Sequence, residues 1–182
     1  MEYLDIVDEQ GQPTGEIISR TLAHTEGIRH RTSHIWIVRR ENEHFQVLMQ
    51  KRAMSKDSFP GKYDTSSAGH IQAGDEPLAS GLRELAEELG IHAKPEDLAF
   101  AGCIHGNFAE EFHGKIFRDN EIAFVYVYQQ PVGIETLVLQ KEEVESVRWF
   151  DLEETYQNCR NHNTQFCAPV PGLEVVRRYL YR

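Results

Sequence analysis

The stretch from Gly69 to Ile91, GHIQAGDEPLASGLRELAEELGI, decides the fold. Its second half predicts a helix over residues 77–89 that ends at Gly90, because glycine readily adopts the left-handed backbone found at helix C-termini. Asp75 is expected at the N-cap, and Pro77 in the first turn, where its missing N–H costs little. One face of this helix is apolar and is expected to pack against a sheet: Leu78, Leu82, Leu85 and Leu89.

The same helix carries Glu84, Glu87 and Glu88 at positions i, i+3 and i+4, which share one face because each residue advances by about 100°. A solvated acidic face is the common explanation of such a pattern. Here the single neighbouring cation, Arg83, cannot pair well with all three carboxylates, and glycines before the helix allow close approach of a ligand to the backbone. Because Mg²⁺ binds a few carboxylates together with substrate phosphates, the residues indicate a metal-and-phosphate site.

The rest of the chain alternates strand-like and turn-like segments. Strands are expected within residues 3–19 (a hairpin), 33–40, 45–52, 98–108, 120–130 and at the start of 144–158. The turn-rich segment 55–70 is expected to be loop with a brief strand, and 103–120 to include a loop that reads the substrate. Residues 171–182 predict a C-terminal helix with Leu173, Val176 and Leu180 on one face. The sum is one α/β or α+β domain with a mixed sheet and two substantial helices.

Composition narrows the class of protein. The 182 residues are 40% hydrophobic and carry a net charge of −10, which excludes a disordered chain and disfavours binding to nucleic-acid polymers or anionic membranes. No apolar run approaches the roughly 20 residues that span a bilayer, and the acidic N-terminus lacks the blocks of a signal peptide. Three widely spaced cysteines are expected to be reduced thiols in a cytoplasmic protein.

Residues 69–91 resemble the Nudix box, whose pattern is G-x5-E-x7-R-E-U-x-E-E-x-G-U, with U apolar. The glycine, the Arg-Glu-Leu triplet, the paired glutamates and the final Gly-Ile all match, and Asp75 stands where the pattern has glutamate. The resemblance implies an α/β/α sandwich with a mixed β-sheet. It implies a single Nudix domain over residues 1–182, with residues 1–30 as an N-terminal β-hairpin extension, and hydrolysis of a small-molecule diphosphate.

The resemblance also implies roles for these residues. Glu84, Glu87 and Glu88, with the backbone of Gly69, would bind Mg²⁺ or Mn²⁺, and Arg83 would hold a glutamate in place by a charge-assisted hydrogen bond. The general base varies in the family; the candidates from a later loop are Glu142, Glu143 and Glu145, and a solvated charge run is an equal explanation of them. A non-catalytic diphosphate-binding module is the alternative from another class. A homodimer is possible, since dimers are frequent in the family.

Over most of the chain the sequence is further similar to type 1 isopentenyl-diphosphate isomerases and related hydrolases, through DIVDEQGQPTG, AHTEGIRHRTSHIWIV, LMQKRAMSKDSFPGKYDTSSAGH and DNEIAFVYVY. Residues matching the isomerase metal site are His24, His30, His70 and Glu121, with the first two one residue closer together than in that pattern. Both could instead cap loops or bond backbone carbonyls.

The isomerase needs a cysteine where this chain has Ala68, and we expect no nearby cysteine to replace it, since Cys103 lies in a later strand. The intact box and the missing thiol together favour hydrolysis. Arg52, Lys62 and His70 are expected to bind substrate. Aromatic residues that could stack on a base, although core packing is their usual role, are Tyr63, Phe108 and Phe112.

Overall fold

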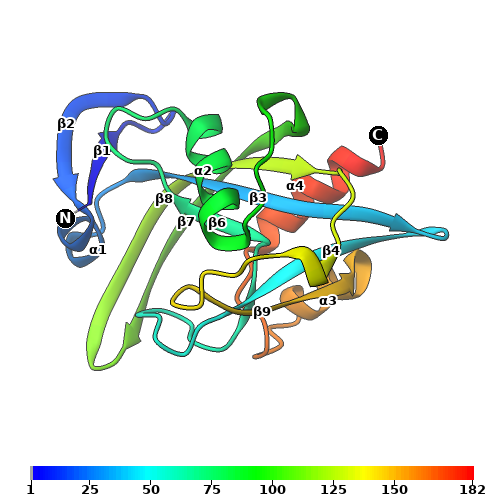
Figure 1. Cartoon of the computed structure of the whole chain (residues 1–182). Coiled ribbons are helices and arrows are strands. Elements are labelled where there is room, and N and C mark those ends of the chain that lie inside the picture. Colours follow the sequence, from blue (N-terminus) through cyan, green and yellow to red (C-terminus); the bar gives the residue numbers. More distant parts are fainter. Residues whose placement is uncertain (1) are drawn as a thin grey trace.

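One mixed sheet, covered by helices on both faces, organises the computed structural model, which describes residues 2–182 (Figure 1). Its strands are β3 (His30–Glu41), β4 (His44–Arg52), β5 (Tyr63–Asp64), β6 (Ser67–His70), β7 (Leu98–Phe112), β8 (Lys115–Tyr128) and β9 (Val144–Asp151). The order is β5-β4-β3-β8-β7, with β6 added to β3 and β9 added to β4. Strands β3 and β8 run parallel, and the other pairs of this sheet are antiparallel, so the expected mixed α/β sheet is confirmed.

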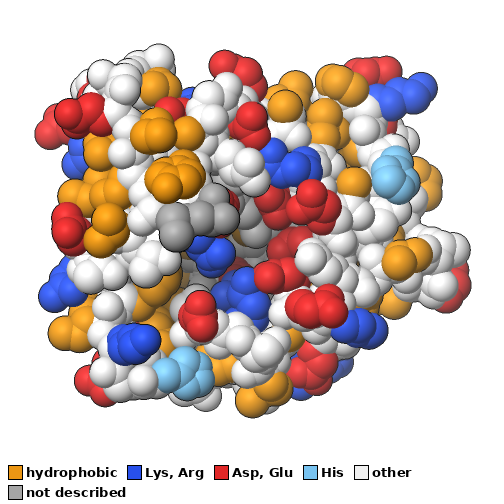
Figure 2. Space-filling view, turned by 60° about the vertical axis from the view of Figure 1, so that its left-hand side comes forward, with side chains coloured by type: hydrophobic (Ala, Val, Ile, Leu, Met, Phe, Trp, Pro, Cys, Tyr) orange, Lys and Arg blue, Asp and Glu red, His pale blue; other side chains and the backbone are white. Residues whose placement is uncertain are grey.

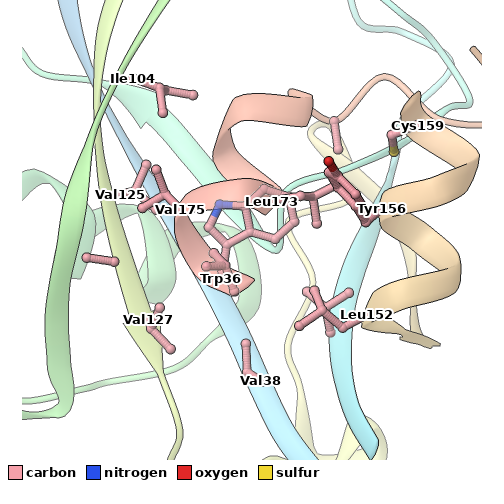
Figure 3. Close-up of a cluster of buried hydrophobic side chains, with 14 of the residues drawn as sticks. Trp36, Val38, Ile104, Val125, Val127, Leu152, Tyr156, Cys159, Leu173 and Val175 are labelled. Atoms are coloured by element: carbon pink, nitrogen blue, oxygen red, sulfur yellow. The ribbon is translucent and has the colours of Figure 1, made fainter. Parts of the chain in front are cut away.

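Alternation along β3 creates two cores. Trp36 and Val38 face α3 (Leu152–Arg160) and α4 (Val170–Leu180), whereas Ile35 and Ile37 face α2 (Pro77–Leu89). Figure 3 shows Trp36 between the strands and residues of both C-terminal helices. Because successive strand residues point to opposite faces, this arrangement produces the expected α/β/α sandwich.

Helix α2 has the predicted bounds, with Gly90 as its left-handed C-cap at φ 71°. The apolar face packs as expected, since Leu85 and Leu89 are fully buried. The expectation for Asp75 is wrong: Glu76 occupies the N-cap and makes no side-chain capping bond. The Asp75 carboxylate instead accepts a 2.6 Å hydrogen bond from Arg83 Nη1, because a guanidinium eight residues along offers a stronger partner than a backbone N–H.

The N-terminal segment contains the expected hairpin, β1 (Tyr3–Val7) paired with β2 (Pro13–Ser19), and in addition a short helix α1 (Arg20–Glu26). Ser19 caps α1 by accepting from Leu22 N–H, and Gly27 closes it at φ 72°. The expected extension of residues 1–30 is thus part hairpin and part helix, and its first residue, Met1, lies outside the described residues. Seven residues are too few to show helical periodicity in a sequence.

The segment expected to hold a substrate-reading loop is regular structure instead. Strands β7 and β8 pair continuously from Leu98↔Tyr128 to Phe112↔Lys115 around a turn at His113 and Gly114, both with positive φ. The distal half of this hairpin projects beyond the rest of the sheet (Figure 1). Short 3-10 turns at Pro95–Asp97 and Ile134–Thr136 complete the described chain. Among residues 2–182, no helix has the length and apolarity to cross a bilayer.

Candidate active site

A polar cavity of about 420 Å³ opens where α2, β6 and the N-terminal ends of β3 and the β7–β8 hairpin meet. Acidic and basic side chains lie together around a recess near the centre of the face in Figure 2. The residues of the box that line the cavity are Gly69, His70, Gln72, Glu84, Glu87 and Glu88. The cavity therefore brings the expected glutamates to one wall.

Glu88 is the buried member of the three glutamates, with 5% of its surface exposed. Its Oε2 accepts hydrogen bonds from Ser67 Oγ at 2.7 Å, Gln50 Nε2 at 3.2 Å and the Ala68 N–H at 3.3 Å. Burial, reinforced by the nearby Glu84 charge, raises the pKa of Glu88 to about 8 despite these donors. The site thus holds a carboxylate whose charge needs a cation beside it.

Glu84 is half-buried, and burial together with the Glu87 charge raises its pKa to about 7 even with Arg83 nearby. A Cβ atom at Gly69 would overlap the carboxylate of Glu84, so glycine at this position makes room for the acid. Glu87 is exposed at the rim of the cavity. Among the described residues these three carboxylates do not approach one another closely enough to form a ready-made ligand cluster, which is consistent with the mutual repulsion of like charges.

Arg83 stands beside the glutamates rather than in the cavity wall. Its strong contact is with Asp75, and its Nη2 lies 3.5 Å from Glu84 Oε1 and 3.4 Å from the carbonyl oxygen of His70. The expected link from Arg83 to a glutamate is therefore present but long. Asp75 accepts the shortest of the three hydrogen bonds that the Arg83 guanidinium donates.

The four residues expected from the isomerase resemblance lie together, and three of them, His24, His70 and Glu121, line the same cavity. Ligand atoms of His24, His30 and His70 lie within 4.8 Å of one another, as do those of His30, Asp119 and Glu121. His24 lies in α1, and the left-handed residue Gly27, which ends that helix, separates it from His30 at the start of β3. Asp119 was not expected from the sequence; the signal available was its position two residues before Glu121, on the same face of β8.

These groups have the chemistry of a metal-binding set. His30 Nε2 and Asp119 Oδ1 are buried without a hydrogen-bond partner, 3.6 Å from each other. Burial and the neighbouring His30 lower the pKa of His24 to about 4, and burial also lowers the pKa of His30 and, strongly, of His70. At neutral pH the imidazoles are therefore neutral and can act as ligands. Three nitrogens with carboxylate oxygens fit a divalent transition metal.

Glu121 is anchored by a residue that the sequence did not suggest. His34 Nε2 lies 3.4 Å from Glu121 Oε1, and both side chains are buried. Burial opposes ionisation of each, but the pair outweighs it, so that the pKa of His34 is raised and that of Glu121 is lowered. Burial and the charge of Glu121 raise the pKa of Asp119 to about 8.

Of the two cations expected to bind substrate, Arg52 lies in the cavity lining and Lys62 does not. Arg52 lines the cavity, where it donates to Asp64 Oδ2 at 3.1 Å and to the carbonyl oxygen of Ser58 at 3.0 Å. Lys62 is not part of the lining, and its Nζ lies 5.5 Å from the centre of the Phe59 ring. Lys56, which the sequence analysis did not single out, lines the cavity instead.

Among the three general-base candidates, Glu143 lines this cavity and pairs with Lys56. Glu145 lies outside the lining and forms a surface ion pair with Lys51 at 2.9 Å. One cysteine that the sequence did not suggest, Cys167, lines the same cavity, with its Sγ 3.6 Å from the carbonyl oxygen of Tyr63. Burial raises the pKa of the Cys167 thiol far above its usual range, so it is not a ready acid or nucleophile.

Comparison with known families identifies a NUDIX domain over residues 28–166. An uncharacterised Nudix hydrolase of Clostridium acetobutylicum is 41% identical over 153 residues, which cover 84% of this chain and 71% of that protein. Nudix hydrolase 3 of Arabidopsis thaliana is 40% identical over 159 residues, 86% of this chain but only 20% of the plant protein. Escherichia coli YfcD, also an uncharacterised Nudix hydrolase, is 33% identical over 87% of this chain and 78% of its own length.

Solved structures agree on the fold. A crystal structure of DR0079 from Deinococcus radiodurans superposes with a TM-score of 0.68 at 19% identity, covering 98% of this chain and 99% of the other. The NUDIX domain of Shewanella oneidensis NrtR, crystallised with ADP ribose, gives a TM-score of 0.59 at 14% identity over 90% of this chain and 99% of that domain.

Proposed function

The chain belongs to the Nudix hydrolase family, and from that premise we propose that it is a metal-dependent hydrolase of the pyrophosphate bond in an organic diphosphate. The observation that carries the proposal is that one cavity is lined both by Glu84, Glu87 and Glu88 and by Arg52 and Lys56. It thus combines carboxylates for a divalent cation with cations for phosphate oxygens. The N-terminal hairpin is proposed to belong to the same domain, because Leu4 in β1 is fully buried and bridges to Gln72.

We propose that Glu84, Glu87 and Glu88, with the backbone of Gly69, hold Mg²⁺ or Mn²⁺. Such an ion, when bound, would neutralise charge on the phosphate oxygens and lower the pKa of a bound water. Ser67, Gln50 and the Ala68 N–H fix the orientation of the Glu88 carboxylate. The pKa values of Glu84 and Glu88 are both raised, so each carboxyl would release its proton when a cation binds beside it near neutral pH.

Hydrolysis adds water to one phosphorus atom and breaks its bond to the bridging oxygen, so a proton must leave the water. Glu143 is the proposed acceptor of that proton, because it is the candidate base that lines the cavity. Its pairing with Lys56 places a cation beside it that could also contact the phosphates. Arg52, held by Asp64 and Ser58, would bind a phosphate oxygen from a fixed position.

We further propose that His24, His30, His70, Asp119 and Glu121 bind a second divalent ion, as in the isomerase-like branch of the family. The buried, unpartnered His30 Nε2 and Asp119 Oδ1, and the short distances among the ligand atoms of the set, support this. Hydrolysis remains the proposed reaction rather than double-bond isomerisation, because Ala68 supplies no thiol and the Cys167 thiol has a strongly raised pKa. ADP ribose, with which the NrtR domain was crystallised, is an example of a ligand that contains a pyrophosphate bond.

A turnover screen tests the proposal. Purified protein with Mg²⁺ or Mn²⁺ is incubated with a panel of organic diphosphates, and the products are identified by mass spectrometry. Metal-dependent turnover that disappears in the double variant Glu87→Gln, Glu88→Gln, and persists in the exposed control Glu96→Gln, supports it. Full activity of the double variant contradicts it. Ligand binding without turnover at any metal concentration would select the binding module, and isomer interconversion without cleavage would select the isomerase.

A further inference from the structure

The imidazole of His34 is buried in the floor of the candidate active-site cavity, and the proposed reaction gives it no role. His34 lies on β3 after His30 and Thr32, and the three side chains share one face of the strand because strand residues alternate between faces. Both Thr32 and His34 line the cavity, although only 7% of the His34 surface is exposed. Buried polar groups are held by partners, so the partner of His34 indicates its role.

The charged partner of His34 is Glu121, one of the residues proposed to bind the second divalent ion. His34 Nε2 lies 3.4 Å from Glu121 Oε1 and 3.3 Å from Thr32 Oγ1. Within the described chain, the other ring nitrogen, Nδ1, is buried without a hydrogen-bond partner. The polar contacts of the ring therefore run through Nε2 alone.

His34 is not itself placed to bind the ion. Ligand atoms of His30, Asp119 and Glu121 lie within 4.8 Å of one another, and among the described residues no such group includes His34. Asp119 and Glu121 are two carboxylates on one face of β8, so their charges repel each other. An N–H donor beside Glu121 counters this repulsion. Because a carboxylate has two oxygens, Glu121 can accept from His34 and still bind an ion.

Packing confines Glu121 from the neighbouring strand β7. Glu121 pairs with Gly106 of this strand, and a Cβ atom at Gly106 would lie 3.0 Å from Glu121 Cγ. Glycine thus leaves just enough room for the stem of the glutamate. With β7 close to the stem and His34 of β3 beside the carboxylate, the side chain of Glu121 is held at both ends.

We propose that His34 is a positioning residue for the second metal site: its Nε2–H holds the Glu121 carboxylate where it can bind a divalent transition-metal ion together with His30 and Asp119. This inference rests on the second metal site proposed above and names a residue that sets its affinity without being a ligand. Removal of a hydrogen-bond partner behind a metal ligand typically costs about 10–100-fold in metal affinity.

Co²⁺ titrations of the full-length protein after chelation test this role without a substrate. The visible absorption of bound Co²⁺ that is lost in the double variant His30→Ala, His70→Ala reports the second site. His34→Leu should weaken this binding about 10–100-fold. His34→Gln places an amide N–H near the position of Nε2 and should bind almost as the wild type does, whereas His34→Asn places its amide nearer Nδ1 and should resemble the leucine variant. His92→Leu, at an exposed histidine outside the cavity, should leave the affinity unchanged.

Equal Co²⁺ affinity in the wild type, His34→Leu and His34→Asn would overturn the assignment, as would a glutamine variant that binds as weakly as the leucine variant. If His34→Leu does not fold, as judged by circular dichroism, the comparison of glutamine with asparagine decides. A wild type without Co²⁺ absorption that depends on His30 and His70 overturns both the second site and the role of His34, while the turnover screen still judges hydrolysis. The expected Co²⁺ affinities in a protein that hydrolyses no diphosphate would uphold the role of His34 and refute the proposed function.

Discussion

Replacing Glu88 by glutamine should change how stability depends on pH. In the metal-free protein, burial raises the pKa of Glu88 from 4.5 to about 8. An unfolded chain releases this proton near pH 4.5, so between the two values the folded state binds more protons. The free energy of unfolding therefore falls as pH rises through this window. Above pH 8 the contribution of Glu88 no longer changes with pH. Glutamine cannot ionise, and its amide oxygen can keep the contacts with Ser67 and Gln50.

The size of the effect follows from the shift. One pKa unit corresponds to about 1.4 kcal/mol, and about two units separate pH 6 from the folded-state pKa near 8. Glu88 should therefore lower the free energy of unfolding of the wild type by about 2.7 kcal/mol between pH 6 and pH 9. For a chain of this length that is a decrease in Tm of about 5–10 °C. If water enters the site when Glu88 ionises, the loss of unfolding free energy is smaller, because water solvates the charge. Mg²⁺ at about a hundred times its Kd would return about 2.7 kcal/mol.

Thermal melts at pH 6 and pH 9, with and without Mg²⁺, measure both effects. Glu88→Gln should show a smaller pH-dependent decrease in Tm than the wild type and little stabilisation by Mg²⁺. The matched variant Glu96→Gln, in which the same change is made at an exposed site, should behave like the wild type. The reasoning is refuted if the wild type and Glu88→Gln lose equal stability between pH 6 and pH 9, or if Mg²⁺ stabilises them equally.

Three further outcomes are expected. Gly69→Ala places a methyl group against the carboxylate of Glu84 and should lower kcat/KM about a hundredfold with a smaller effect on Tm, as measured by steady-state kinetics and thermal melts. Ser67→Ala removes the 2.7 Å donor that lowers the pKa of the buried glutamate beside it, so the pH midpoint of Mg²⁺ activation should move upward; a downward or absent shift would argue against this role. His30→Ala combined with His70→Ala should abolish a tightly bound transition metal detected by elemental analysis, which the glutamine variants of the box should retain.

Local patterns made the helix of the box, the hairpin within residues 3–19 and the pairing of β3 with β4 predictable. The leucine spacing of residues 78–89 and the glycine after them determine α2 whatever surrounds it, and the apolar alternation of β3 and β4 predicts their pairing. Asp75 shows the limit of this reasoning. A good N-cap residue in the right place was diverted by Arg83, a partner that becomes available only after the helix has formed.

The missed features depend on contacts that are distant in sequence. The segment 103–120 has the glycines and charges of a loop, yet its two halves pair because each satisfies the other's backbone groups. Asp119 joins the histidines because β8 lies parallel to β3, with His30 opposite Glu121. Neither the parallel register nor the burial that leaves His30 without a partner can be read from one strand alone.

Strand β6 connects the two proposed metal sites, and its register explains why they must be considered together. Its first three residues serve the glutamate site and its last serves the histidine cluster: Ser67 and the Ala68 N–H bond Glu88, Gly69 makes room for Glu84, and His70 joins His24 and His30. Pairing with β3, from Thr32↔His70 to Ile35↔Ser67, fixes this order. A slip of one residue would exchange the faces of the strand and separate both sites from their ligands. The stretch that resembles the Nudix box is therefore one element of a larger cavity, whose second half also depends on His24 and His30 from the N-terminal part of the chain.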